Sequence, residues 1–368
     1  MTAKKIRWGF LSTAQIARKN WKAIRNTGNS TVAAVASREL ERSRRFITAC
    51  QREVPMESEP KAYGSYEELL ASKDVDAVYI PLPTGLRREW VIRAAQAGKH
   101  IVCEKPCATS VADLREMLDA CRQHKVQFMD GVMFMHSQRL NRIREVLNDG
   151  TSVGDVKRIN TSFSFLADDA FYSENIRANS VLEPFGCLGD LGWYCIRFAL
   201  WVRNEELPRT VTGRILSEVR GKNSPAAIPT EFSGELHFDD GVSSGFYISF
   251  RSYDEQCATI SGTKGYLRVS DFVLPFFGNE CSFEVNNAAY NVTGCEFNME
   301  PHWRRFTIPE YSNSHPTAQE TNLFRSFSDR ILAGTLNDAW PDIAFKTQHV
   351  MNACFDSARA DSRVVELR

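Results

Sequence analysis

Hydrophobic and polar positions alternate in two different ways along this chain of 368 residues, and the change falls near residue 135. Before it, short apolar runs such as "TVAAVAS" (31–37) and "DAVYIPLP" (76–83) take turns with segments whose apolar residues recur at helical spacing. Strands that are apolar on both faces are typical of parallel sheets, and each parallel pair needs a crossover connection. The first part of the chain therefore predicts a doubly wound parallel sheet.

Local signals place the helices of this part. A helix over 15–26 follows the first strand, "IRWGFLS" (6–12). Ser65, with Glu68 three residues later, forms a capping box at the start of another helix. A helix from residue 88 ends at Gly98, because glycine is favoured just past a helix end. The remaining strands and helix follow in the order 100–106, 110–125 and 126–133.

Longer strands, some of them with alternating polarity, fill the part after residue 135. Alternation indicates one buried and one exposed face, so we expect an antiparallel or mixed sheet. The expected strands are 156–165, 235–250, 256–271 and 281–294, and the expected helices are 187–202, 317–333 and 343–359. The sequence thus predicts an α/β protein with two domains, residues 1–133 and an α+β domain of residues 134–368.

Composition narrows the classes of function. The formal net charge is zero, so no basic excess points to nucleic acid. No apolar stretch approaches the roughly 20 residues that span a bilayer, and the N-terminal apolar run is too short for a signal peptide. The ten cysteines are scattered and the seven histidines form no H-E-x-x-H set, so we expect reduced thiols in a cytoplasm and no metal site. Cys187 and Cys195 are expected in the core.

The stretch "RWGFLSTAQIAR" (7–18) has the outline of the strand, tight turn and helix that bind a dinucleotide. The three glycines of G-x-G-x-x-G are replaced by Ser12, Ala14 and Ala17. These residues are small enough for the backbone to approach a pyrophosphate, and the Ser12 and Thr13 hydroxyls can bond phosphate. A plain strand–helix junction is the alternative for this stretch taken alone.

The end of the second strand favours NADP over NAD. A fold that prefers NAD has an acidic residue there, whereas this chain has Ser37 and Arg38, with Arg42 one helical turn later. Ser37 can donate to a phosphate, and Arg38 can stack on adenine or grip a phosphate in a fork. A solvated basic helix start is the alternative.

Two further segments carry candidate chemistry. In "CEKP", Pro106 holds Lys105 extended at the carboxyl edge of the sheet, where such sheets place ligands. In "FGCLGDLGWYCIRFALW" (185–201), Asp190 and Tyr194 are four residues apart and share a helix face, and the glycines permit close approach. An acid, a tyrosine and a lysine in one cleft form a proton-transfer set. The alternatives are an ordinary strand-end lysine, a core tyrosine and an aspartate stabilised by the helix dipole.

The segments "GFLSTAQIA", "ASREL", "VYIPLPTGLRREWVIRAAQAGKHIVCEKP", "GDLGWYCIR" and "ISGTKGYLRV" occur in this order between residues 6 and 275. Together they resemble the Gfo/Idh/MocA family, named for glucose-fructose oxidoreductase and inositol dehydrogenase, and its branch with dimeric dihydrodiol dehydrogenase and NADP-dependent D-xylose dehydrogenase. The resemblance implies a Rossmann domain for NADP in residues 1–133. It also implies a large open sheet for substrate binding and oligomerisation in residues 134–368.

The resemblance also implies roles for single residues. Tyr194 would be the proton donor and acceptor, Lys105 its electrostatic partner, and Asp190 would orient the substrate or the lysine. Phe134 and His136 are substrate candidates. Arg87 stands where many members carry histidine, and no role is assigned to it. The cofactor-binding residues would be Ser12, Thr13, Ala14, Ile16, Ser37, Arg38, Arg42, Pro81, Leu82, Pro83, Glu104 and Lys105.

The implied reaction is hydride transfer between nicotinamide C4 and a hydroxyl or carbonyl carbon of a sugar, polyol or dihydrodiol. We expect NADP as cofactor, a small-molecule substrate, and a homodimer or larger homo-oligomer in which a partner subunit covers the open sheet. Two alternatives stay open. One is a glycosidase-like enzyme with tightly held NAD, and the other is a non-catalytic NADP-binding regulator.

Overall fold

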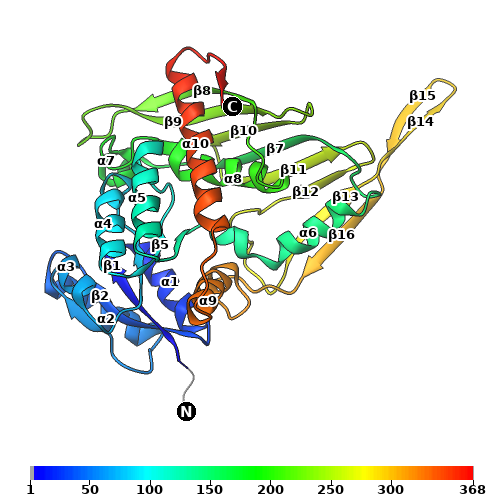
Figure 1. Ribbon diagram of the computed structural model, residues 1–368. Coiled ribbons are helices and arrows are strands. Elements are labelled where there is room, and N and C mark those ends of the chain that lie inside the picture. Colours follow the sequence, from blue (N-terminus) through cyan, green and yellow to red (C-terminus); the bar gives the residue numbers. More distant parts are fainter. Residues whose placement is uncertain (1–3, 368) are drawn as a thin grey trace. The chain divides into compact units, whose positions relative to one another are not determined.

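The computed structural model describes residues 4–367, and the chain forms two compact units (Figure 1). The first unit comprises Met1–His136, Val181–Pro184 and Tyr311–Gln348, and the second comprises Ser137–Ser180, Phe185–Glu310 and His349–Arg368. The chain therefore crosses between the units several times rather than once. The functional division at residues 133 and 134 stays a prediction.

The first unit holds a six-stranded parallel sheet in the order β3-β2-β1-β4-β5-β6. This order is that of a doubly wound dinucleotide-binding fold, so the predicted fold class is confirmed. The strands are β1 (Ile6–Leu11), β2 (Ser30–Ala36), β3 (Lys61–Tyr63), β4 (Ala77–Ile80), β5 (His100–Cys103) and β6 (Phe128–Asp130). The helices between them are α1 (Gln15–Arg25), α2 (Leu40–Glu53), α3 (Tyr66–Ala71), α4 (Thr84–Gln96) and α5 (Val111–Gln123), and η1 (Met133–His136) follows β6.

Local capping explains where these helices begin and end. Ser65 accepts a hydrogen bond from the backbone N–H of Glu68 at the start of α3, as the capping box predicts. Gly98 lies just past α4 with a φ of +71°, the left-handed conformation that glycine adopts at low cost. The helix expected from residue 88 begins already at Thr84, because Pro83 stands directly before it and presets the backbone for entry.

The helix α9 (Gln319–Leu332), the last but one in the described chain, completes the hydrophobic core of the first unit. The Trp8 ring of β1 lies 5.0 Å from the Phe324 ring and 5.3 Å from the Phe327 ring, measured between centroids. The helix α10 (Ala339–Arg359) begins in this unit and ends in the other. Burial of large aromatic side chains dominates the energetics of such a core. The N-terminal strand is therefore stabilised by a helix that follows it by three hundred residues.

The second unit is built on a nine-stranded sheet in the order β16-β13-β12-β11-β7-β10-β9-β8-β17. Strands β7 and β10 pair in parallel and the other neighbours pair antiparallel, so the predicted large, mainly antiparallel sheet is confirmed. Its strands are β7 (Val156–Ser164), β8 (Thr210–Val219), β9 (Ile228–His237), β10 (Ser243–Ser249), β11 (Glu255–Gly262), β12 (Tyr266–Val269), β13 (Cys281–Asn286), β16 (Trp303–Ile308) and β17 (Val365–Glu366). The helical segments are α6 (Gln138–Asn148), α7 (Asp169–Glu174), η2 (Ile176–Ala178), η3 (Leu188–Gly192) and α8 (Trp193–Val202).

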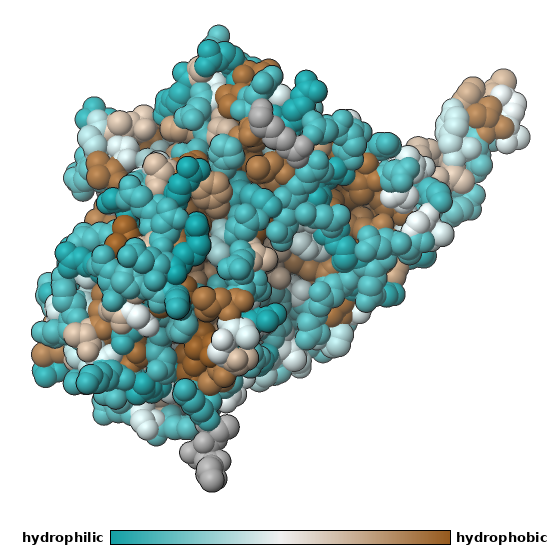
Figure 2. All heavy atoms as spheres, in the orientation of Figure 1, coloured by the Kyte–Doolittle hydropathy of each residue, from teal (hydrophilic) through white to brown (hydrophobic). Residues whose placement is uncertain are grey.

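The expected long strands of this unit are divided. The stretch 235–250 turns back at Gly241, whose φ is +80°, and the stretch 281–294 holds β13 and then β14 (Ala289–Thr293). The D-D-G sequence before the second half of 235–250 is a turn signal that explains the division. Strand β14 pairs only with β15 (Glu296–Glu300), and this ribbon extends beyond the edge of the nine-stranded sheet (Figures 1 and 2).

The helix α8 packs on β7 and β10 on one face of the nine-stranded sheet, and the other face carries polar side chains. On the polar face, a hollow of about 590 Å³ is lined by Arg158, Asn160, Ser233, Glu235 and Tyr247, among others. The Arg158 guanidinium pairs with Glu235 there. A polar open face agrees with the alternation seen in the sequence.

The core predictions for cysteine are confirmed. Cys187 and Cys195 are buried, and burial raises the pKa of the Cys195 thiol to about 12. Such thiols are inert at neutral pH. None of the helices in residues 4–367 combines the length and the apolar character needed to cross a membrane.

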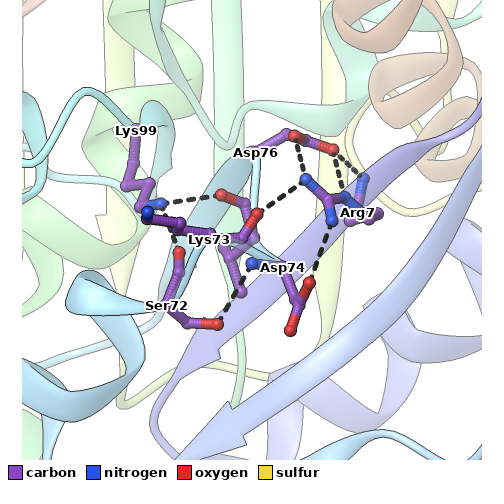
Figure 3. A network of polar contacts seen from close by, with 7 residues as sticks. Arg7, Ser72, Lys73, Asp74, Asp76 and Lys99 are labelled. Carbon is purple, nitrogen blue, oxygen red and sulfur yellow. Dashed lines mark hydrogen bonds and ion pairs between the residues drawn. The ribbon is translucent and has the colours of Figure 1, made fainter.

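A polar network joins the amino ends of β1 and β4 in the first unit (Figure 3). Arg7 donates to Asp76 through Nε at 3.0 Å and through Nη2 at 2.9 Å, and to the Lys73 carbonyl oxygen at 2.8 Å. Lys99 donates to the Ser72 carbonyl oxygen at 2.7 Å. Burial alone raises the pKa of Asp76, but the Arg7 hydrogen bonds outweigh burial, so that the pKa lies below its usual value. The ion pair thus stabilises the edge of the sheet opposite the ligand edge.

Candidate functional site

The turn between β1 and α1 is shaped for an anion. Ser12 has a φ of +148°, and its hydroxyl oxygen accepts a hydrogen bond from the Ala14 N–H at 3.1 Å. Within residues 4–367, no side chain caps α1, and its first turn holds no acidic residue. The N–H groups at this helix end therefore stay available to a phosphate. Ala17 is fully buried and lets the helix pack on the sheet, whereas Thr13 and Ile16 are partly exposed at the turn.

At the end of β2, the predicted phosphate-binding residues differ in their surroundings. The Ser37 hydroxyl donates to the Glu39 carbonyl oxygen at 2.6 Å and accepts from Ser43 at 3.1 Å, so its only proton is used inside the protein. Arg38 and Arg42 are exposed, and in the described part of the chain no carboxylate pairs with either. Both arginines lie near the Tyr66 ring. Burial raises the pKa of Tyr66, and the positive charges of Arg38 and Arg42 offset part of that rise.

The loop after β4 is tied to the end of β5. Pro81 and Leu82 are buried at the carboxyl end of β4, and Pro83 precedes α4. The buried Arg87 guanidinium donates through Nε to the Leu82 carbonyl oxygen at 2.7 Å and through Nη1 to the Pro106 carbonyl oxygen. The sequence assigned no role to Arg87. In the structure, its side chain joins Leu82, after β4, to Pro106, the residue after Lys105.

A carboxylate from the segment 181–184 holds the start of α4. Glu183 accepts the Thr84 N–H at 3.0 Å and the Thr84 hydroxyl at 2.6 Å, and the Gly85 N–H donates to the Leu182 carbonyl oxygen at 2.9 Å. A Cβ on Gly85 would lie 2.4 Å from the Val181 carbonyl oxygen, so only glycine fits this approach. Negative charge at a helix N-terminus is favourable. Glu183 thus stabilises the loop after β4.

Glu104 and Lys105 directly follow β5, and Glu104 lies in a buried polar cluster. The Tyr79 hydroxyl donates to Glu104 Oε1 at 2.5 Å, and the Lys105 N–H donates to Glu104 Oε2 at 3.3 Å. Burial, together with the nearby Glu104 charge, raises the pKa of Tyr79 well above its usual value. Tyr79 therefore stays a hydrogen-bond donor at every physiological pH. Lys105 itself is partly exposed at this edge.

The two substrate candidates after β6 differ in exposure. Phe134 is 1% exposed, whereas His136 is partly exposed. The His136 ring lies 6.5 Å from the Trp340 ring, and its carbonyl oxygen accepts from Asn322 at 3.3 Å. Contact with a substrate stays a prediction for both residues. Across residues 4–367, no group of three His, Cys, Asp or Glu side chains is placed to hold a metal ion.

The second unit holds Asp190 and Tyr194. Asp190 lies in η3, a single π-helical turn that runs directly into α8. The shared helix face of Asp190 and Tyr194 stays a prediction. Asp190 Oδ2 lies 2.8 Å from Arg177 Nε. Such π turns occur frequently at functional sites.

Tyr194 lies in the first turn of α8 and is 7% exposed. Its ring lies 5.8 Å from the Phe163 ring of β7, which lies 6.3 Å from the Phe272 ring. Gly186 and Gly192 of this segment lie close to the sheet. A Cβ on Gly192 would lie 2.9 Å from the Ile248 side chain, and one on Gly186 would lie 2.2 Å from the Pro229 carbonyl oxygen. Close packing of this turn on the sheet thus sets the position of the tyrosine within its unit.

Sequence reasoning missed several contacts of the candidate site. Arg177, the partner of Asp190, lies in a segment with no recognisable motif. Glu183 lies far along the chain from Thr84, and no local pattern signals their contact. For Tyr79, a signal was present, since a tyrosine inside a strand apolar on both faces needs a buried hydrogen-bond partner. Lys105 belongs to the first unit and Tyr194 to the second, and their joint role stays a prediction.

The residues of the first unit fit a dinucleotide. The uncapped start of α1 offers N–H groups, and Arg38 with Arg42 offers charge where the ribose of the adenosine half binds in this fold. Glu104 and the loop 81–83 lie at the carboxyl ends of β5 and β4, the edge at which doubly wound sheets bind ligands.

Comparison with known proteins agrees with this geometry. Residues 6–132 match the model of an oxidoreductase family with an NAD-binding Rossmann fold, and residues 140–268 match the GFO/IDH/MocA C-terminal domain. Trans-1,2-dihydrobenzene-1,2-diol dehydrogenase of Xenopus laevis is 29% identical over 306 residues, which cover 80% of this chain and 87% of that protein. D-xylose 1-dehydrogenase (NADP(+)) 2 of Haloferax volcanii is 30% identical and covers 72% and 75% of the two chains.

Solved structures show the same fold over the whole chain. Aldose-aldose oxidoreductase from Caulobacter crescentus has a TM-score of 0.80 at 23% identity and covers 99% of this chain and 100% of that one. A 3-ketoreductase from Actinomadura kijaniata, in complex with NADP and TDP-benzene, has a TM-score of 0.77 at 23% identity and covers 98% of each chain. The chain belongs to the GFO/IDH/MocA family of oxidoreductases, with the NAD(P)-binding Rossmann fold of that family at its N-terminus.

Proposed function

We propose that this chain is an NADP-dependent dehydrogenase or reductase acting on a CH–OH or carbonyl carbon of a sugar, polyol or dihydrodiol. The observation that carries the proposal is the pair Arg38 and Arg42, for which residues 4–367 provide no carboxylate partner at the end of β2. Two guanidinium groups beside the ribose fit a 2′-phosphate, and the fold normally places an acidic residue there for NAD. The dihydrodiol and xylose dehydrogenases among the relatives support the substrate class.

Each of the candidate residues has a separate role in the proposed reaction. The nicotinamide supplies hydride chemistry when bound. Tyr194 exchanges a proton with the substrate oxygen, and Lys105 stabilises the charge that develops there. Asp190, held by Arg177 at 2.8 Å, orients the substrate or the lysine. Glu104, fixed by Tyr79, positions the backbone of Lys105. Phe134 and His136 contact the substrate.

The cofactor preference is tested by measuring dissociation constants of NADPH and NADH for the variant Arg38→Ala/Arg42→Ala. A hydrogen bond to a charged group is worth about 1.5–3 kcal/mol, so loss of NADPH affinity of about tenfold to a hundredfold per arginine is expected, with NADH binding unchanged. The matched control is Arg44→Ala on the same helix, because Arg44 already pairs with Glu41 at 3.7 Å. Equal losses for NADPH and NADH would contradict the proposal.

The competing functions make different predictions in one assay. A glycosidase-like enzyme would retain an absorbing cofactor through purification and would reduce no free cofactor with any sugar. A non-catalytic regulator would bind NADPH without turnover on a broad panel of sugars and diols. Net reduction of free NADP⁺ by a member of the panel supports the proposed dehydrogenase over both. A cytoplasmic location stays a prediction, and fractionation of cells expressing the chain tests it.

A further inference from the structure

The ribbon formed by β14 and β15, residues 289–300 and here called the arm, has an apolar face with nothing packed on it in its own unit. In register, Tyr290 faces Met299 and Val292 faces Phe297, and these four side chains are 54–67% exposed. The alternate pairs are polar, with Asn291 opposite Asn298. Because successive residues of a strand point to opposite faces, one face of the arm is apolar and the other polar.

The arm has no support from the nine-stranded sheet. It forms a separate two-stranded sheet that is inserted between β13 and β16, and almost all of its residues are exposed (Figures 1 and 2). A two-stranded ribbon standing alone in water is marginally stable at best. The arm lies outside the residues that match the models of the family's two domains. An apolar surface must therefore cover it in the working protein.

A complementary surface lies at the other end of the same sheet. The exposed residues Tyr253, Leu274, Phe276 and Phe277, here called the loop patch, follow the end of β10 and the end of β12. The side chain of Gln256, at the start of β11, bonds both backbone groups of Leu274 at 2.7 Å and so ties the loop after β12 to β11. Phe277 is 90% exposed, which is exceptional for a side chain of this size.

Strand directions relate the arm to the loop patch. Tyr266 at the start of β12 pairs with Asn286 at the end of β13, so the arm leaves the sheet where β12 begins. The loop patch lies where β12 ends, beside the start of β11 and the end of β7. Consider two copies whose nine-stranded sheets stack face to face, related by a two-fold axis that lies between the sheets and perpendicular to the strands. The strands of one copy then run opposite to those of the other. This arrangement would thus bring the arm of each copy to the loop patch of the other.

We propose that the arm of one copy of this chain packs its apolar face on the loop patch of a second copy, and that the two exchanged arms clasp a homodimer. Aromatic side chains bury 150–250 Å² each, so the exposed part of one arm face is about 400 Å² and its contact with a matching patch removes about 800 Å². Two such contacts remove about 1,600 Å², the size of a standard interface. A single arm on an unrelated partner would remove only half of this, the size of a crystal contact.

The test compares neighbouring residues on opposite faces of the arm. Phe297→Glu and Asn298→Glu add the same charge, and only the first places it in the proposed contact. Sedimentation velocity over a range of protein concentrations should give a dimer for the unchanged chain and for Asn298→Glu. The dissociation constant of the Phe297→Glu dimer should rise at least tenfold, and Phe277→Glu in the loop patch should act alike. Thermal unfolding midpoints close to that of the unchanged chain exclude a folding defect as the cause.

Cross-linking from the tip of the arm tests which surface the arm contacts. Cys295 lies in the turn of the arm and is exposed, whereas the other nine cysteines are buried or partly buried. A benzophenone attached to Cys295 in mixed isotope-labelled dimers should capture peptides of the loop patch of the other copy. A monomer at all concentrations, a dimer equally sensitive to both arm variants or to neither, or capture of another arm instead of the loop patch would each overturn the proposal.

Discussion

The hydrogen bond between Tyr79 and Glu104 offers a direct test of how the first unit holds its cofactor edge. Tyr79 is fully buried, and its hydroxyl lies 2.5 Å from a carboxyl group that is itself 9% exposed. Replacing Tyr79 with phenylalanine removes the donor and leaves the carboxylate in place. A hydrogen bond to a charged group is worth about 1.5–3 kcal/mol, and a buried acceptor without its donor also loses its compensation for desolvation. Tyr79→Phe should therefore lower the free energy of unfolding by about 2 kcal/mol.

A double-mutant cycle separates this contact from a general packing effect. In the background Glu104→Gln the acceptor is neutral, so Tyr79→Phe should cost about 1 kcal/mol, and the difference between the two costs is the coupling energy. Urea unfolding of the first unit can be followed by the fluorescence of Trp8 and Trp21, which are buried in its core. The control is Tyr63→Phe on β3, a tyrosine whose hydroxyl has no hydrogen-bond partner in the described chain.

The variant Tyr79→Phe also tests whether Glu104 supports cofactor binding. Because the other carboxyl oxygen of Glu104 accepts the Lys105 N–H at 3.3 Å, loosening Glu104 should weaken NADPH binding, and the control should not. The reasoning is refuted if Tyr79→Phe costs the same in both backgrounds, or if it destabilises the chain no more than Tyr63→Phe does.

Three further predictions follow from the site and its supports. Tyr194→Phe should lower turnover about 10²- to 10⁴-fold while the NADPH dissociation constant stays unchanged, since proton transfer by a positioned group contributes this much. Glu183→Ala should lower the free energy of unfolding by about 0.5–2 kcal/mol in urea, because the Thr84 N–H and hydroxyl lose their acceptor at the start of α4. Asp76→Asn should cost about 1 kcal/mol at neutral pH, because its pair with Arg7 is partly exposed and screened. The folded-state pKa of Asp76 lies below its unfolded value, so its stabilisation is present above that unfolded value, about 3.9, and is lost as pH falls through the folded pKa.

Each of these predictions has its own control. Unchanged turnover of Tyr194→Phe would remove the proton role. For Glu183, the variant Glu183→Gln keeps one acceptor oxygen and should recover part of the loss, whereas equal losses for both variants would argue against the hydrogen bonds. For Asp76, the free energies of unfolding of the variant and the unchanged chain should converge in acid. Asp74→Asn, at an exposed neighbour, should show little change at any pH.

The sequence was most informative where the signal is local. The alternation of apolar strands and helices predicted the parallel sheet of the first unit, because each strand buried on both faces must be apolar throughout. The hydroxyl of Ser65 predicted the start of α3, because a cap is made with residues only three positions away. The segment "CEKP" placed Lys105 at the carboxyl edge of the sheet, since parallel strands all end at the same edge.

Contacts between distant segments were decided only by the tertiary structure. Glu183 bonds Thr84, about a hundred residues earlier in the chain. Arg177 pairs with Asp190, which lies in a π turn. The helix α9 packs on Trp8 of the first strand and helps to bury it. No local period encodes such contacts, because which side chains meet depends on how the elements pack. The alternation of polarity in 281–294 likewise indicated strands, but only the register of β14 with β15 reveals one continuous apolar face with nothing in its own unit to cover it. Local chemistry thus determined the elements and the candidate residues, whereas packing between distant parts of the chain decided which partners hold them in place.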